Sequence, residues 1–265
     1  MVEPVVTTGK SRKRLWIYIT GSLFISFTLY YSVMAFVSSS GKIREINTAF
    51  AFKAAENQNF DDRIFSDSLF VKLSREKAYL QSRNLLAESD SIYLSLNLVD
   101  STAFLEINGV TVHTAKLENI KVCKALYRAN EYALSSLLSL PFTVMENRGT
   151  IMKEPLMLKV APKDTSEYKP DILPDTANTA PVNYILEMDN GFRIYVYQDD
   201  ESGEAMSRIM FDLNDRLRNT WSNIKSIAVF RVPVYHPSIK LRMKKVDARI
   251  IYRALPVHGQ VAIFR

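Results

Sequence analysis

The 265-residue chain has little of the material that metal and disulfide sites need. It contains one cysteine, Cys123, and three histidines, His113, His236 and His258. A single cysteine excludes an intrachain disulfide framework and the multi-cysteine zinc and iron–sulfur patterns, and three scattered histidines offer few ligands to another metal. We therefore predict no metal site and no cofactor.

An excess of positive charge is also absent from most of the chain. The net charge of +6 consists of +3 before residue 15, +7 over residues 231–265 and −4 over the remainder. A nucleic-acid-binding protein typically carries a wider basic surface. We expect no nucleic-acid partner, and each basic end is a local feature.

One long uncharged run stands near the N-terminus. Residues 15–37 read LWIYITGSLFISFTLYYSVMAFV. As a helix this run spans about 35 Å, enough to cross a hydrocarbon core of about 30 Å. A basic cluster ending at Arg14 precedes it, and positive residues stay in the cytoplasm. We predict a transmembrane helix that binds the lipid bilayer through residues 15–37, with residues 1–14 as a cytoplasmic tail.

A buried core helix and a cleaved signal peptide are the alternatives. The polar residues of the run are mostly threonine and serine, whose hydroxyls can bond to their own helix backbone. Apolar regions of signal peptides are shorter, about 7–15 residues, which favours a signal anchor. The chain has no Asn-x-Ser/Thr acceptor, which favours a bacterial protein. We expect the bacterial inner (cytoplasmic) membrane, with the C-terminal domain periplasmic or otherwise extracytoplasmic.

Residues 38–90 are predicted to form a helical stalk. Residues 42–90 contain no proline or glycine and are rich in helix-forming residues. Two apolar sets recur at helical spacing: Ile43, Ile46 and Phe50, and then Phe65, Leu69, Leu73 and Leu80. Asn57-Gln58-Asn59 predicts a break, hence two helices. The stalk either forms a homodimer or packs on the distal domain, and it lacks the three sustained heptads of a coiled coil.

After residue 90 the pattern changes to alternation. The predicted strands are 91–99, 103–107, 110–114, 156–160, 184–188, 192–197, 228–234 and 261–264, and the predicted helices are 124–140, 204–219 and 246–255. Asn108-Gly109 is a strong hairpin signal. Four prolines predict an irregular loop over 161–181. We predict an exported domain over residues 91–265, mainly β with α (α+β).

Both ends of this domain carry recognisable sequence segments. It opens with IYLSLNLVDSTAFLEINGVTV and closes with IKLRMKKVDARIIYRALPVHGQVAIF. These segments resemble the two ends of the catalytic domain of the L,D-transpeptidase family, whose enzymes cross-link bacterial peptidoglycan. That family closes with a Cys-(Ile/Val)-Arg-(Met/Leu) motif, a helix and a glycine-containing turn into a last strand. The resemblance implies a β-sandwich with short peripheral helices.

The catalytic residues of that family are replaced. In the family a cysteine thiolate attacks the donor peptide, and a histidine on a neighbouring strand activates it. The matching positions hold Lys240 and Tyr195. Cys123 lies in the first part of the domain, before the predicted helix 124–140, and does not replace the nucleophile. We therefore predict no catalytic residues.

The basic C-terminal segment supplies candidate binding residues. Arg242 can pair bidentately with a carboxylate, Lys240, Lys244 and Lys245 add charge, and His236 lies nearby in the sequence. A solvated basic strand is the alternative. We predict a non-catalytic scaffold that binds peptidoglycan or an envelope protein. A divergent peptidoglycan-modifying enzyme, either acyl transferase or hydrolase, and a structural subunit of an export or motility machine are the other hypotheses.

Overall fold

The computed structural model describes residues 9–50, 67–153, 180–199 and 205–265, which fall into two compact units. The first unit contains the residues up to Lys42 together with Arg216–Tyr235, and the second contains Ile43–Asp215 and His236–Arg265. Two helices contribute residues to both units: α1 (Gly9–Ala49) and α5 (Ala205–Ala228).

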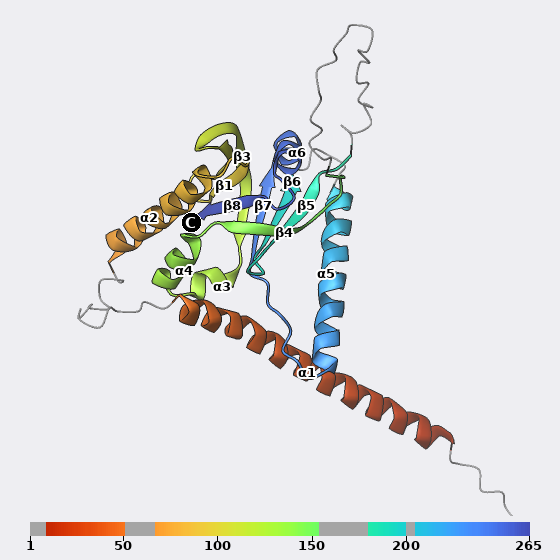
Figure 1. Cartoon of the computed structure of the whole chain (residues 1–265). Helices are drawn as coiled ribbons and strands as arrows, with labels where there is room; N and C mark the ends of the chain where they lie inside the picture. Colours follow the sequence, from red (N-terminus) through yellow and green to blue (C-terminus); the bar gives the residue numbers. More distant parts are fainter. Residues whose placement is uncertain (1–8, 51–66, 154–179, 200–204) are drawn as a thin grey trace, which may run out of the picture. The chain divides into compact units, whose positions relative to one another are not determined.

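The second unit contains a closed β-barrel (Figure 1). Its strands in the described residues are β1 (Tyr93–Asn97), β2 (Thr102–Ile107), β3 (Val110–Val122), β4 (Phe142–Gly149), β5 (Asn183–Met188), β6 (Arg193–Gln198), β7 (Ser238–Met243) and β8 (Gln260–Phe264). They follow the order β1-β2-β3-β7-β6-β5-β4-β8 around the barrel. The pairs β1–β8 and β6–β7 are parallel, and the other neighbours are antiparallel.

Alternation along the strands separates the barrel core from its outer surface. In β7, Ile239, Leu241 and Met243 are buried, whereas the intervening residues are partly exposed. Successive side chains of a strand point to opposite faces, so Lys240 and Arg242 lie on the outer face. Strand β6 is buried along its whole length because Phe211 of α5 packs on its outward-facing tyrosines.

The predicted hairpins are confirmed. Asn108 and Gly109 both have positive φ, 49° and 80°, as a two-residue turn of this type requires. Gly191, with φ 77°, lies in the turn between β5 and β6. Strand β3 continues well beyond the predicted end at residue 114, because residues 117–122 leave β2 and pair with β7.

The α+β class is confirmed, and several element boundaries differ from the predictions. The eight strands close into one barrel, which is not plainly the sandwich that the resemblance implies. Strand β4 was not predicted. The predicted helix 124–140 is two helices, α3 (Lys124–Arg128) and α4 (Glu131–Leu138), because Asn130 accepts a hydrogen bond from the backbone of Tyr132 and caps α4. Helix α6 (Lys245–Ala254) agrees with its prediction.

The predicted strand 228–234 is wrong. Helix α5 has 24 residues, longer than a short peripheral helix, and reaches Ala228, while residues 229–237 contain neither helix nor strand. Pro233 has no N–H to donate to a sheet, which disfavours a strand there. The predicted strand 156–160, the break at 57–59 and nearly all of the loop 161–181 lie outside the described residues.

Helix α1 carries the predicted membrane segment. By length and composition it can cross a membrane, and it continues without interruption through the predicted start of the stalk. The hydroxyls of Thr28 and Ser32 each donate to the carbonyl four residues earlier, at 2.8 Å, as expected for polar groups in an apolar run. At its C-terminal end, in the second unit, Ile46 is buried and Phe50 is half-buried against the barrel core.

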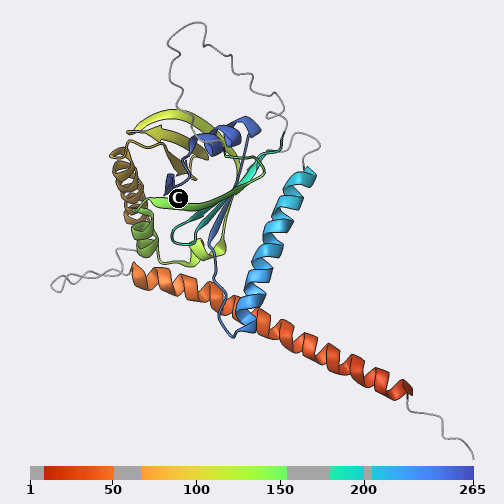
Figure 2. The ribbon, with the colours of Figure 1, turned by 45° about the vertical axis from the view of Figure 1, so that its right-hand side comes forward.

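Helix α2 (Ser68–Ala87) packs on the barrel (Figures 1 and 2). Its buried residues are Ala78, Tyr79, Ser82 and Leu86, and Tyr79 stacks on Phe264 of β8 with ring centroids 5.0 Å apart. The apolar residues chosen from spacing, Leu69, Leu73 and Leu80, are exposed instead. The packing alternative for the stalk thus holds for α2, and dimerisation through its exposed leucines stays a prediction.

A buried ion pair joins α2 to the barrel. Glu106 is fully buried, and its carboxylate accepts hydrogen bonds from Arg83 Nε, at 3.1 Å, and from Ser95 Oγ, at 2.8 Å. Arg83 Nη2 adds a second contact. These hydrogen bonds and the charge of Arg83 compensate the buried carboxylate of Glu106, whose ionised form burial alone would strongly disfavour.

Replacing Arg83 by alanine should destabilise the protein by about 2–3 kcal/mol, below the ~3–5 kcal/mol for a fully buried pair because Arg83 is partly exposed. Arg75 of the same helix provides the control, since its pair with Glu131 is about one-third exposed on both sides. Arg75→Ala should cost under about 1 kcal/mol. Urea denaturation of both variants measures the difference, and equal losses would contradict this account.

Candidate functional site

The two positions that the resemblance assigns to base and nucleophile lie side by side. Strands β6 and β7 are parallel neighbours, and Tyr195 is the register partner of Lys240. The ammonium of Lys240 lies 4.9 Å from the centroid of the Tyr195 ring and 5.6 Å from that of Tyr197. Residues that are far apart in the sequence thus form one site on the outer face of the barrel.

Two acids from the first half of α5 face this site. Asp212 and Asp215 are three residues apart, so they lie on the same face of the helix. The Tyr195 hydroxyl donates to Asp215 at 2.9 Å. Asp212 accepts from the Tyr197 hydroxyl at 2.7 Å and from Lys240 Nζ at 3.0 Å. Both the tyrosine and the lysine therefore have an acidic partner in the same chain.

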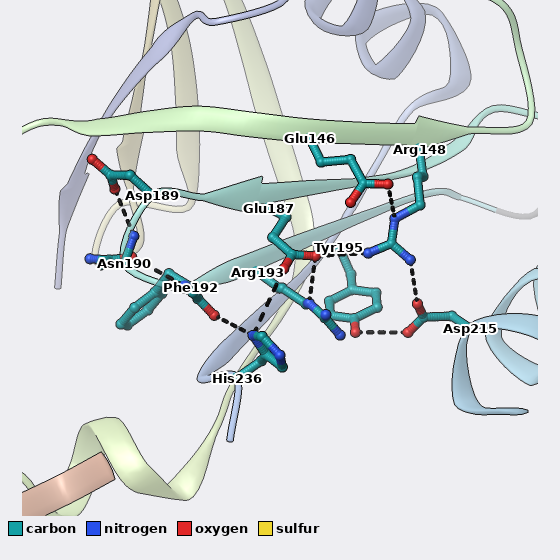
Figure 3. A network of polar contacts seen from close by, with 11 residues as sticks. Glu146, Arg148, Glu187, Asp189, Asn190, Phe192, Arg193, Tyr195, Asp215 and His236 are labelled. Atoms are coloured by element: carbon teal, nitrogen blue, oxygen red, sulfur yellow. Dashed lines mark hydrogen bonds and ion pairs between the residues drawn. The ribbon is translucent and has the colours of Figure 1, made fainter. Parts of the chain in front are cut away.

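Arg148 connects Asp215 to the carboxylate of Glu187 (Figure 3). It donates to Asp215 Oδ1 at 3.3 Å and to Glu187 Oε2 at 2.8 Å, and Glu146 lies 3.4 Å from its Nε. Arg193 Nε donates to the same Glu187 oxygen at 3.0 Å. The network alternates in charge and joins β4, β5 and β6 to α5.

His236, a predicted binding residue, lies at the edge of this network. Its Nδ1 is 3.0 Å from the carbonyl of Gly191 and 4.0 Å from Glu187 Oε1 (Figure 3). These contacts hold the segment before β7 against the turn between β5 and β6. The geometry gives His236 a positioning role for backbone, whereas its predicted role in ligand binding stays a prediction.

Burial and neighbouring charges change the ionisation of the site. Burial, reinforced by Asp215, raises the pKa of Tyr195 to about 12. Burial, reinforced by Asp212, also raises the pKa of Tyr197. Burial opposes ionisation of Glu187, but the hydrogen bond and charge of Arg193 outweigh it and lower the pKa of that carboxyl. Both phenols are therefore neutral at neutral pH, and Glu187 is ionised.

This arrangement supplies neither a base nor a nucleophile of the family's kind. A neutral phenol that donates to a carboxylate is not a base, and an ammonium that donates to a carboxylate has no lone pair for attack. The contacts of Tyr195 and Lys240 instead fasten α5 to the barrel. Within the described residues, moreover, no group of three or more His, Cys, Asp or Glu side chains could hold a metal ion.

Cys123 is closer to this region than its sequence position suggests. Its N–H donates to the carbonyl of Ser238, at the start of β7, over 2.9 Å. The side chain, however, packs against the barrel core rather than the outer face. Cys123 therefore does not share the outer face with Tyr195 and Lys240.

The outer face of β3 adds a basic residue that the sequence analysis did not single out. Lys121 is exposed and is the register partner of Lys240, and Asn119 is the partner of Arg242. Arg242 Nη1 lies 3.7 Å from Asp199. Alternation over residues 116–122 was the available signal for the longer strand and hence for Lys121.

The other two predicted basic residues lie just beyond β7. Lys244 is exposed and occupies the N-cap position of α6, and Lys245 is the first residue of that helix. Lys240 and Arg242 are on the outer face of the strand, so the four basic residues lie close together in the chain but are separated by the buried Leu241 and Met243. Comparison of the chain with protein-family models, with curated proteins and with solved structures finds no match.

Replacing Glu187 by glutamine should destabilise the protein by about 1–3 kcal/mol at neutral pH, since two arginines lose a charged acceptor. The native pKa of Glu187 lies below its ordinary value of 4.5, so its contribution is present above that value and is lost as the pH falls through the native pKa. The gap between variant and wild type should therefore narrow progressively as the pH is lowered below 4.5.

Urea denaturation at neutral and acidic pH measures this gap. Glu146→Gln is the matched control, because Glu146 is about half exposed and lies farther from Arg148. Its effect should stay below about 1 kcal/mol at either pH. A gap for Glu187→Gln that is independent of pH would refute the assigned ion pair.

Proposed function

We propose that the chain is a single-pass membrane protein of a bacterial cell envelope whose exported barrel binds peptidoglycan without cross-linking it. The observation that carries the proposal is the pairing of Tyr195 with Lys240 on neighbouring strands, each bonded to an acid of α5. Adjacent strands are where an L,D-transpeptidase-like domain holds its histidine and cysteine. Both positions are filled by side chains with structural contacts, which supports a binding module over an enzyme.

The outer face of β3 and β7 is the proposed binding surface. Lys121 and Lys240 lie directly opposite each other, and like charges in that position destabilise a sheet. A carboxylate placed between them relieves this repulsion, and Arg242 can add a bidentate contact. Stem peptides of peptidoglycan carry such carboxylates. Asp212 and Asp199 already offset part of the charge, so binding is weak at each site and benefits from a polymeric ligand.

The membrane segment sets the compartment in this proposal. Residues 15–37 cross the inner membrane, the basic cluster ending at Arg14 stays in the cytoplasm, and the barrel lies on the other side with access to the cell wall. What supports it is the length and apolar composition of α1.

A structural subunit of an envelope assembly is the second candidate, and α5 favours it. Met206, Ile209, Met210 and Leu213 are all exposed at helical spacing on the first half of this helix. A contiguous apolar surface of this kind is typical of a protein interface. In this case the barrel positions α5 for a partner protein, and the β3–β7 face has no ligand.

The full-length protein in detergent should sediment with purified peptidoglycan and leave its muropeptide composition unchanged. Replacing both Lys121 and Arg242 by alanine should weaken sedimentation roughly tenfold, as expected when about 1.4 kcal/mol is lost. Lys116→Ala is the control, because Lys116 is exposed on the same strand but pairs with Thr102 of β2.

Three results would count against the proposal. New muropeptides that disappear in Lys240→Ala would show catalysis. Equal loss of binding in Lys116→Ala would point to general charge rather than the β3–β7 face. Absence of sedimentation by the wild-type protein would favour the assembly subunit, which cross-linking from position 209 in intact cells then tests directly.

A further inference from the structure

Phe230 ends α5 in an unfavourable backbone conformation. Its N–H donates to the carbonyl of Ile227 at 3.0 Å, and the N–H of Arg231 donates to that of Ser226 at 2.9 Å. This pair of bonds is a Schellman motif with Phe230 at the position that usually holds glycine. The φ of Phe230 is 56°, a region that bulky residues avoid. Strained backbone conformations of this kind cluster at functional segments.

The Phe230 ring is 83% exposed, and neighbouring apolar residues are exposed as well. Val229, Val232 and Val234 have exposed fractions of 64%, 48% and 69%. Four large apolar side chains within six residues are thus presented outward. Such a patch is costly in water and marks an interaction surface.

Two contacts place this patch beside the membrane segment of α1. The ring of Phe230 meets the ring of Tyr30 edge-on, with centroids 6.3 Å apart. The hydroxyl of Ser38 is buried and donates to the carbonyl of Pro233 at 2.6 Å. Figures 1 and 2 both show the last turns of α5 next to α1, and all these residues belong to the first unit.

The spacing of these contacts along α1 gives the depth of the patch. Tyr30 lies within the uncharged run 15–37, and Ser38 follows it directly. Eight residues of helix separate the two, about 12 Å. The chain from Phe230 to Pro233 therefore follows the last two turns of the run, where lipid chains would surround α1.

The residues around the patch suit an anionic membrane surface. Residues 216–235 contain four basic residues and no acidic one. Lys225 and Arg231 are exposed, and Lys225 lies 5.6 Å from the centroid of the Trp221 ring, which is 61% exposed. Tryptophan and basic residues beside an apolar patch are typical of segments at the headgroup level.

We propose that residues 229–234 insert into the leaflet at the Ser38 end of α1, with Trp221, Lys225 and Arg231 among the anionic headgroups. This inference rests on the proposed membrane anchor. A lipid surface is favoured over a partner protein because the patch runs along the membrane segment itself and its charge has one sign. Insertion gives the chain a second attachment to the bilayer beside α1.

Tryptophan quenching in lipid vesicles tests the proposal with the full-length chain. Its two tryptophans, Trp16 and Trp221, are each replaced by phenylalanine, and Phe230→Trp then provides a single reporter. Val99→Trp in the same background is the aqueous control, because Val99 is 63% exposed in the turn between β1 and β2. A third protein, Trp221→Phe alone, retains Trp16 and reports on the anchor.

In vesicles of phosphatidylcholine and phosphatidylglycerol with brominated chains, the reporter at 230 should lose roughly half of its emission or more and shift to the blue, whereas the reporter at 99 stays unquenched. Trp16 should be quenched too.

A second reporter, Val232→Trp, is used in case a tryptophan at position 230 does not adopt the positive-φ backbone of Phe230. When Phe230→Gly is added to the protein with the reporter at 232, its unfolding temperature should stay unchanged or rise. The quenching of the tryptophan at 232 should nevertheless decrease.

The outcomes separate the two proposals. Quenching of Trp16 without quenching at 230 and 232 overturns the insertion and leaves the anchor intact. No quenching of Trp16 overturns both.

Discussion

The parallel pairing of β6 with β7 is the constraint on which the site depends. A register that sets Tyr195 opposite Lys240 brings the two side chains together on the outer face, because alternation sends Ile194 and Ile239 into the core. A shift by one residue would exchange the two faces and place a lysine inside the barrel, at a cost of several kcal/mol. The tight apolar core thus enforces the polar arrangement outside it.

That arrangement gives Tyr195 and Lys240 structural contacts. Asp212 and Asp215 of α5 accept from Lys240, Tyr197 and Tyr195, and Arg148 links Asp215 to Glu187. Each charge has an opposite partner within hydrogen-bond distance, so the network is nearly neutral and α5 is held on the sheet. A catalytic site needs a group whose charge or proton changes in the reaction, and this network opposes such changes.

Helix α5 connects the polar network to the turn at Phe230 along the chain. Its first half contributes acids to the barrel network, and its second half leads to the strained turn at Phe230. Two structural features that appear unrelated in the sequence therefore belong to one continuous helix. In the proposed arrangement the same helix attaches to the barrel through charge and to the bilayer through apolar contact.

The sequence by itself determined the features that depend on local pattern. The uncharged run predicted a helix able to cross a membrane, alternation predicted the β1–β3 meander, and Asn108-Gly109 predicted its turn, because each depends on residues close together in the chain. Local pattern failed at residues 228–234, where three valines and a phenylalanine resemble a strand but the α5 cap and Pro233 prevent it. Local pattern also selected the exposed leucines of α2 as the packing face of that helix. A stripe of apolar residues does not by itself reveal which part of the protein packs against it.

Only the tertiary structure decided which side chains meet. The resemblance matched Tyr195 and Lys240 to the histidine and cysteine positions of the family. Their partners Asp212, Asp215 and Lys121, however, come from α5 and from the extension of β3. The order of the strands around the barrel brings these segments together. That order follows from long-range burial of apolar surface rather than from any short motif. The chemical character of the site, an ion-pair network in place of a nucleophile and base, therefore depends on the whole fold.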